Sequence, residues 1–203
     1  MRTNNKEIIS HLLAATNRTG YNELIAHMEA CGFFEAPCSG QKHLSEEGGL
    51  AEHTVNVTQM ALSLKETYAH DVPSDSVIIC AILHDLGKVG QFGKPNYVPN
   101  MLTPRATKAN PNPEPYQSEK RPYITNPDLM YVDHEIRSIV IAQKYIELTE
   151  EEQTAILWHN GLYGPFKYEI PGKETPLYLL IHMADMWASR VIEKEEALDE
   201  SEE

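Results

Sequence analysis

An uninterrupted apolar run over residues 77–83 ends abruptly at His84 and Asp85. The run predicts a buried helix, and an imidazole and a carboxylate at its end cost free energy unless both find partners. A metal ion satisfies both groups at once. Further candidate ligands, each on its own predicted helix, are His53 upstream and His134, His159 and Asp185 downstream. The chain is therefore expected to fold so that these helices bring their polar residues together.

Helical periodicity and capping signals predict an all-α fold. Thr149 and Glu152 match the capping box of a helix start. Pro176 occupies a first helical position, and Ser74 is expected to cap the helix that carries the apolar run. The expected helices cover residues 7–16, 21–31, 50–70, 74–87, 132–148, 150–161 and 176–190.

The chain is expected to form a single domain over residues 1–203. Within it, residues 1–35 are an N-terminal helical extension, and residues 193–203 are an acidic, solvated tail. Residues 91–128 hold eight of the thirteen prolines and show no helical period. Long segments of this kind in compact domains are usually functional, so we expect a proline-rich insertion that forms a loop or lid.

The formal net charge of -13 restricts the partners of this chain. Such an acidic surface repels long nucleic acid and anionic membranes, whereas a small anionic substrate responds to the local field. The first residues lack a signal-peptide pattern, no apolar run is long enough to span a membrane, and the three cysteines form no C-x-x-C pair. We therefore expect a cytoplasmic protein without a disulfide framework; a homo-oligomer is compatible with the sequence.

The candidate ligands are separated by roughly one helix plus one connection each, which is how helical bundles build metal sites. Four imidazoles and two carboxylates suit two divalent ions, with iron or manganese favoured and magnesium or nickel as alternatives. Asp85 lies centrally in the series and is the natural bridge between two ions. Adjacent helical residues point about 100° apart, so His84 and Asp85 can share one site only near a helix end, which Gly87 supplies.

The segment from Lys88 to Arg121 carries six basic and two acidic residues, a local positive excess in an acidic chain. A positive field beside a metal site suits a phosphorylated ligand, and the tyrosines of the segment can stack on a base. A solvated loop with scattered charges is the alternative. The residues expected to bind the substrate are Lys88, Arg105, Lys108, Arg121 and Tyr123.

Three further residues lie near the candidate ligands, and the sequence does not assign a definite role in the site to any of them. His43 either lines the pocket or caps its loop. His182 lies on the same helical face as Asp185 and either supports the metal site or is an ordinary helical residue. Arg190 is interpreted as structural.

The order His53, His84-Asp85, Asp185 resembles the HD-domain superfamily of metal-dependent phosphohydrolases. Residues 48–54, 81–88 and 182–185 are similar to its first-histidine helix, its central motif and its closing aspartate helix. Residues 133–138 and 158–160 resemble the extra histidines of its dinuclear members. The similarity spans residues 36–191, and the segments around Gly48 and His182 also resemble the HD module of bacterial 3′–5′ exoribonucleases.

This resemblance implies an HD-domain helical bundle with two metal sites that share one carboxylate. By the resemblance, Lys88 contacts the substrate phosphate, and Asp85 and Lys88 are the catalytic residues. The ligands implied for the first ion are His53, His84, Asp85 and Asp185. Those implied for the second are Asp85, His134 and His159.

The implied activity is hydrolysis of a phosphate mono- or diester by metal-activated water, with a nucleotide or another small phosphorylated metabolite as substrate. Two alternatives remain open. A di-iron oxygenase resembling myo-inositol oxygenase has a similar ligand order and would consume oxygen without releasing phosphate. A non-catalytic nucleotide sensor would bind its ligand tightly without turnover.

Overall fold

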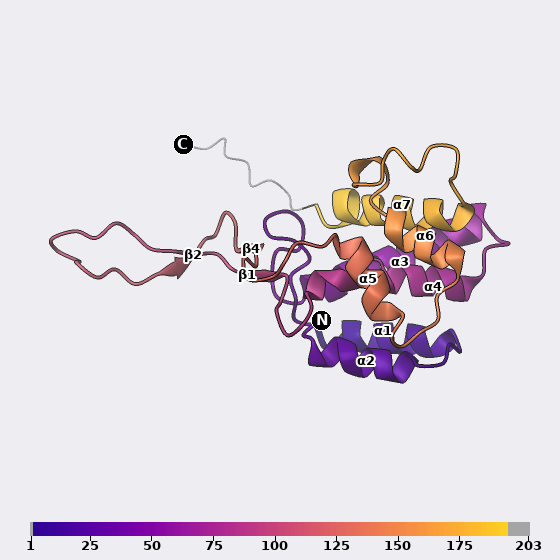
Figure 1. Cartoon of the computed structure of the whole chain (residues 1–203), viewed down its shortest axis with the longest axis horizontal. Helices are drawn as coiled ribbons and strands as arrows, with labels where there is room; N and C mark the ends of the chain where they lie inside the picture. The colour runs from indigo at the N-terminus through magenta and orange to yellow at the C-terminus, as the bar shows by residue number, and fades with distance from the viewer. Residues whose placement is uncertain (1, 195–203) are drawn as a thin grey trace.

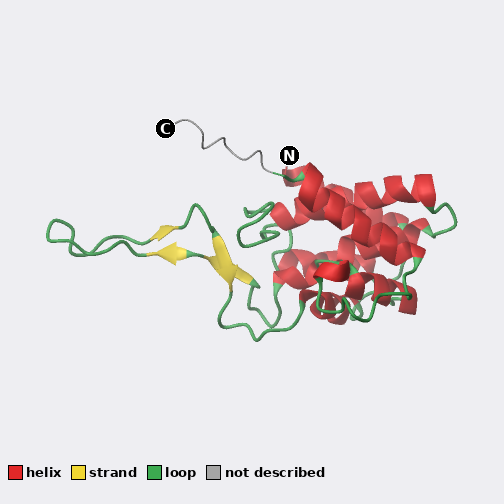
Figure 2. Ribbon diagram, turned by 90° about the horizontal axis from the view of Figure 1, so that it is seen from above, coloured by secondary structure: helices red, strands yellow, loops and turns green. Residues whose placement is uncertain are grey.

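The computed structural model describes residues 2–194, so most of the expected acidic tail lies outside the described residues. The described part is built of helices apart from a few short strands, which confirms the predicted all-α class (Figure 2). The α-helices are α1 (Arg2–Ala15), α2 (Tyr21–Ala30), α3 (Gly49–Tyr68), α4 (Ser74–Leu83), α5 (His134–Ala142), α6 (Glu150–Trp158) and α7 (Pro176–Trp187). Shorter helical segments are the 3₁₀ turns η1 (Leu86–Val89) and η2 (Gly161–Tyr163) and the π-helical turn η3 (Ala188–Ile192).

Helix α4 is the centre of the hydrophobic core. All seven of its residues from Val77 to Leu83 are buried, and the helix packs against α1, α3, α5, α6 and α7. A helix that is apolar on every side is stable in water only when it is covered on every side. The buried helix predicted from the apolar run is therefore confirmed. No helix in the described residues combines the length and apolarity needed to cross a bilayer.

The helix starts are largely those that the sequence predicts. Thr149 accepts a hydrogen bond from the backbone of Glu152, whose side chain bonds back to Thr149, so the capping box is confirmed. Pro176 is the first residue of α7. The expectation for Ser74 is wrong: this residue is the first of α4, Pro73 takes the cap position, and no side chain caps the helix.

Arg18 fastens the N-terminal helical pair to the rest of the bundle. Its guanidinium lies 3.0 Å from Asp75 at the start of α4 and also pairs with Glu152 in α6. Gly20, two residues after Arg18, has a φ of 85°, and a Cβ there would lie 1.8 Å from the carbonyl oxygen of Tyr145. The α1–α2 turn therefore has room only for glycine at this position.

The proline-rich insertion is an arm rather than a lid. Strand β1 (Tyr97–Pro99) pairs antiparallel with β4 (Tyr123–Thr125), and β2 (Met101–Leu102) pairs with β3 (Tyr116–Gln117). The resulting hairpin, residues 97–125, projects away from one end of the helical body (Figure 1). Prolines remove backbone donors and exclude helix, so the segment satisfies part of its backbone by pairing with itself and does not fold back over the helices.

Candidate metal centre and active site

The end of α4 places His84 and Asp85 side by side in the interior. Helix α4 ends at Leu83 and η1 begins at Leu86, so Asp85 lies between two helical segments with a φ of −107°. This change of direction lets two adjacent side chains face one site, which a continuous helix would prevent. His84 is 0% exposed and Asp85 1% exposed.

Close packing against α5 holds this turn in place. A Cβ on Gly87 would lie 2.1 Å from the carbonyl oxygen of His134, so only glycine allows the two backbones to approach. The hydroxyl of Ser138 accepts a hydrogen bond from the Gly87 amide and donates one to the His84 carbonyl. Gly87 thus does more than end a helix, because it also brings His134 to the cluster.

Three of the predicted ligands meet Asp85 on one side. The Nε2 atoms of His53 and His84 are 3.3 Å apart. His53 Nε2 lies 3.2 Å from Asp185 Oδ1, and His84 Nε2 lies 3.3 Å from Asp85 Oδ2. Side chains from α3, α4 and α7 therefore converge on one point.

The other two predicted ligands meet the opposite oxygen of the same carboxylate. His134 Nε2 lies 3.2 Å from Asp85 Oδ1, and His159 Nε2 lies 3.6 Å from it. The two imidazole nitrogens are 3.4 Å apart. The structure thus brings all six predicted ligands together, with Asp85 between a group on α3, α4 and α7 and a pair on α5 and the end of α6.

The outward nitrogens of three of these histidines are hydrogen-bonded. His84 Nδ1 lies 2.8 Å from the carbonyl oxygen of Ala81, and His159 Nδ1 lies 2.8 Å from that of Ile156. His53 Nδ1 lies 3.0 Å from both carboxylate oxygens of Glu193. A proton on each Nδ1 leaves the Nε2 lone pair free and directed at the cluster, as in histidines that bind metals.

Two buried carboxylate oxygens in the cluster lack a hydrogen-bond donor. Among the described residues, Asp85 Oδ1 and Glu135 Oε2 are buried and accept no hydrogen bond. The two side chains are only 1% and 2% exposed, so water does not reach these oxygens. Such groups are costly. A cation beside Asp85 would satisfy its oxygen, so the donor set fits divalent metal ions.

The electrostatics of the cluster favour metal-binding protonation states at two residues. Burial and neighbouring His84 lower the pKa of His159 to about 3, so this imidazole is neutral at pH 7. Burial alone would raise the pKa of Asp85, but Lys88 and His84 outweigh it and hold this pKa well below its usual range. Neutral imidazole and ionised carboxylate are the forms that bind cations.

His53 differs from His159 in its protonation. Burial would lower its pKa, but Cys38 and the hydrogen-bonded carboxylates of Asp185 and Glu193 outweigh burial and raise this pKa well above its usual value. A cation bound by its Nε2 would displace the proton, because metal ligation and protonation compete for the same lone pair.

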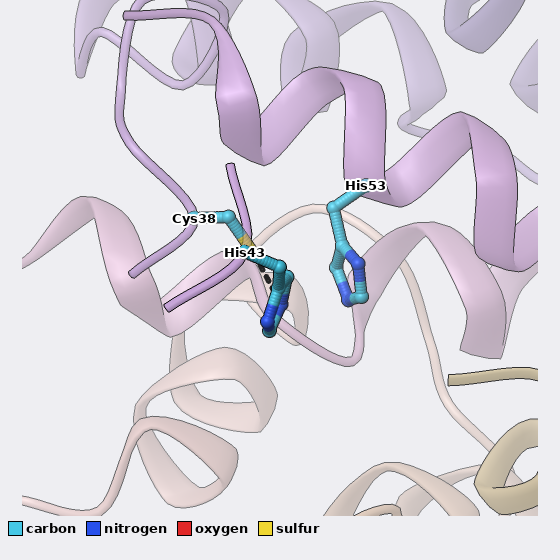
Figure 3. A group of neighbouring side chains, drawn as sticks. All are labelled: Cys38, His43 and His53. Carbon is cyan, nitrogen blue, oxygen red and sulfur yellow. Dashed lines mark hydrogen bonds between the residues drawn. The ribbon is translucent and has the colours of Figure 1, made fainter. Parts of the chain in front are cut away.

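The loop between α2 and α3 adds Cys38 and His43 to the edge of the cluster (Figure 3). His43 Nε2 lies 3.5 Å from Cys38 Sγ, and its ring centroid lies 5.2 Å from that of His53. Burial and the charge of His53 lower the pKa of His43 to about 4. Of its two interpretations, the structure favours pocket lining over loop capping.

A cavity of about 680 Å³ opens over the cluster. Its lining includes Lys88 but none of the other residues that sequence analysis assigned to the substrate. Arg105, Lys108 and Arg121 are exposed and Tyr123 is half-buried, all four on the arm. The structure does not bring these four residues to the cavity, because the arm projects away from it (Figure 1), and their contact with the substrate stays a prediction. The remaining lining residues are Lys42, His43, His134, His159, Asn160, Tyr163, Asp185, Ser189, Arg190, Glu193 and Lys194.

Sequence analysis assigned no role in the site to Asn160 and Glu135, which contact the predicted ligands. Asn160 Nδ2 donates to Glu135 Oε1 at 2.7 Å and lies 3.0 Å from His159 Nε2. Glu135 directly follows His134 in the sequence, and Asn160 directly follows His159. This adjacency to predicted ligands is the sequence signal that could have identified the two residues. His182 Nδ1 lies 2.7 Å from the carbonyl oxygen of His159, which supports the interpretation that His182 positions the site.

Comparisons with known proteins found one family and one relative that are similar to this chain in sequence. The family model for the HD domain matches residues 50–185, more than half of the chain. The chain is 47% identical over 58 residues to the dihydroneopterin 2′,3′-cyclic phosphate phosphodiesterase of Methanocaldococcus jannaschii, covering 27% of this chain and 23% of that protein. The matched part thus spans about a quarter of the relative's length. No solved structure matches the chain.

Proposed function

This chain belongs to the HD domain family, as the motifs predict, and on that premise we propose that it is a metal-dependent phosphodiesterase. The observation that carries the proposal is the central position of Asp85. One carboxylate oxygen faces His84 and the other faces His134, and the second lacks a hydrogen-bond donor among the described residues. This is the arrangement expected of a carboxylate that bridges two cations.

The proposed ligands divide into two sets around that bridge, each drawing on different helices. Mixed nitrogen and oxygen ligands favour iron or manganese over magnesium. Two bound ions would supply an activated water and stabilise the negative charge that develops on the oxygens around phosphorus. The set proposed for the first ion is His53, His84, Asp85 and Asp185, and the set for the second is Asp85, His134 and His159.

Lys88 is proposed to hold a phosphoryl oxygen of the substrate. It lines the cavity and forms an ion pair with Asp85. Burial would lower its pKa, but the Asp85 carboxylate outweighs burial and raises this pKa well above its usual value. The side chain is therefore an ammonium at pH 7, and it can neutralise charge on the phosphate without accepting a proton.

The substrate is proposed to be a small cyclic phosphodiester of a nucleotide or nucleotide-like metabolite. The relative from Methanocaldococcus jannaschii is named for a 2′,3′-cyclic phosphate, and a cavity of about 680 Å³ is of the size that holds such ligands. The net charge of -13 disfavours long nucleic acid. Hydrolysis would add water across one P–O bond of the ring and yield a phosphate monoester.

The test is a hydrolysis screen of the purified protein loaded with manganese, iron or magnesium. Nucleoside 2′,3′-cyclic phosphates, 3′,5′-cyclic nucleotides and nucleoside monophosphates are incubated with it, and products are identified by phosphorus NMR. We expect ring opening of a cyclic phosphodiester that stops when Asp85 is replaced by alanine. Oxygen consumption by the iron-loaded protein without cleavage of any phosphate ester would contradict the proposal and favour an oxygenase.

A further inference from the structure

The outer wall of the cavity carries more positive charge than the rest of this acidic chain would suggest. Lys42 comes from the loop before α3, and Arg190 and Lys194 come from the segment that follows α7. All three are exposed, and within residues 2–194 none of them forms an ion pair with a carboxylate. They lie on a chain whose formal net charge is -13.

The carboxylates of the same cavity do not cancel this charge. Asp185 Oδ1 lies 3.2 Å from His53 Nε2, and Glu193 faces His53 Nδ1 and accepts a hydrogen bond from Asn56. Both carboxylates thus point into the cluster, where they interact with His53. Within residues 2–194, the outer wall therefore carries a local excess of positive charge, which attracts anions to the mouth of the cavity.

The guanidinium of Arg190 is held in a defined place. It lies over the ring of Tyr163, 4.5 Å from the ring centroid. A cation–π contact of this kind restricts the side chain, and a guanidinium carries its N–H donors along the edge of its plane. That edge has the geometry to bind a phosphate through two parallel hydrogen bonds.

The backbone around Arg190 has an unusual conformation. Helix α7 widens into the π-helical turn η3 at Ala188–Ile192, and Arg190 is the middle residue of that turn. Turns of this kind are frequent at functional sites. Here the widened turn brings both Arg190 and Glu193 to the cavity wall. Arg190 lies on the outer wall, and Glu193 contacts His53.

The inner part of the cavity already has a phosphate-binding cation, Lys88, next to the cluster. The scissile phosphate needs Lys88 and the metal ions, which leaves the outer cations without a function in the proposed reaction. We infer that Lys42, Arg190 and Lys194 form a second anion subsite that binds another phosphate group of the substrate. The preferred substrate is then a cyclic phosphodiester that carries a further phosphate, such as a nucleoside 2′,3′-cyclic phosphate with a 5′-phosphate.

This inference rests on the proposed function and is tested with a matched pair of substrates. Adenosine 2′,3′-cyclic phosphate is compared with the same compound carrying a 5′-phosphate, using the manganese-loaded protein. We expect kcat/KM to be at least about tenfold higher for the 5′-phosphorylated compound, mainly through a lower KM, since charge-assisted hydrogen bonds to the extra phosphate are gained on binding. The preference should weaken as salt is added.

Variants assign the preference to the outer cations. Arg190→Ala and Lys42→Ala should each reduce the preference several-fold while changing kcat for the unphosphorylated compound little, and Arg190→Lys should retain part of it. Lys167→Ala is the matched control, because Lys167 also lies over a tyrosine ring, Tyr168, but does not line the cavity. The control should behave as the wild type.

The outcomes separate the inference from the proposed function. Equal kcat/KM values for the two substrates in the wild type would overturn the second subsite and leave the phosphodiesterase standing. A preference that survives in Arg190→Ala and Lys42→Ala would also overturn it. Hydrolysis of neither substrate, with any metal of the screen, would overturn the proposed function and the subsite with it.

Discussion

His53 and Glu193 are 140 positions apart in the chain, yet the Nδ1 atom of His53 lies 3.0 Å from both carboxylate oxygens of Glu193. Asn56, one helical turn after His53, donates to the same carboxylate. The pairing fixes which nitrogen of His53 carries the proton and aims the other at Asp85 and Asp185. A residue outside the proposed ligand set thereby orients one of the proposed ligands.

Replacing Glu193 by alanine should weaken binding of the first metal ion by about tenfold to a hundredfold, because a ligating imidazole loses the carboxylate that orients it. Titration of the metal-free protein with manganese in the presence of a competing chelator measures this affinity. Glu52→Ala is the control, since Glu52 lies on the same helix as His53 but is exposed. An unchanged affinity in Glu193→Ala would show that the pairing has no part in metal binding.

Removal of the Lys88 ammonium should lower activity without emptying the metal site. In Lys88→Met, kcat for a cyclic phosphodiester is expected to fall by about a hundredfold, as when one preorganised charge-stabilising donor is lost. Metal content, measured by elemental analysis, should stay at the wild-type value. Full activity in Lys88→Met would contradict the proposed contact with the phosphate.

His134→Ala should leave one metal ion on the protein instead of two. The first set of ligands does not include His134, whereas the second would keep only His159 and the shared Asp85. Elemental analysis after removal of unbound metal gives the number of ions per chain. His11→Ala, which changes an exposed histidine of α1, should retain both ions. Two ions on His134→Ala would mean that the second set is wrongly assigned.

Glu152 should stabilise the fold in a manner that depends on pH. Burial would raise its pKa, but hydrogen bonds from Arg18, Thr149 and Ser76 lower it. A carboxyl whose pKa is depressed by folding contributes stability above its unfolded pKa, near 4.3, and this contribution is lost as the pH falls through the lower folded pKa. Glu152→Gln should therefore cost about 2–3 kcal/mol of unfolding free energy at pH 7, since it breaks a buried ion pair.

The loss in Glu152→Gln should shrink as the pH falls below about 4.3, where this carboxyl takes up a proton in the unfolded wild-type chain, and it should be smallest below the lower pKa of the folded protein. Urea unfolding of both proteins at several pH values measures this difference. Glu151→Gln removes the charge of the preceding, exposed glutamate and should change stability by less than about 0.5 kcal/mol at any of these pH values. A loss in Glu152→Gln that is independent of pH would exclude the ionised pair as its cause.

The core and the convergence of the ligands could be predicted from sequence because each depends on short-range patterns. A run of apolar residues over 77–83 requires burial on all sides, and polar residues at its end require partners. The capping box at Thr149 is likewise decided by residues three apart. At both places the structure preferred locally is also the one present in the folded protein.

The role of Glu193 and the course of the arm could not be predicted in this way. Glu193 begins an acidic run that reads as solvated, and only the π-helical turn before it places the side chain beside His53. Prolines in residues 91–128 exclude a helix there, but composition says nothing of the direction in which a hairpin leaves the body. Both outcomes depend on contacts between distant parts of the chain.

Asp85 is proposed to bridge two metal ions, which are held by histidines and Asp185 from five helical segments. Anomalous diffraction from crystals of the manganese-loaded protein tests it most directly. We expect two peaks about 3.5–4 Å apart, one beside His53 and Asp185 and the other beside His134 and His159, with Asp85 between them. A single peak, or none within reach of Asp85, would contradict it.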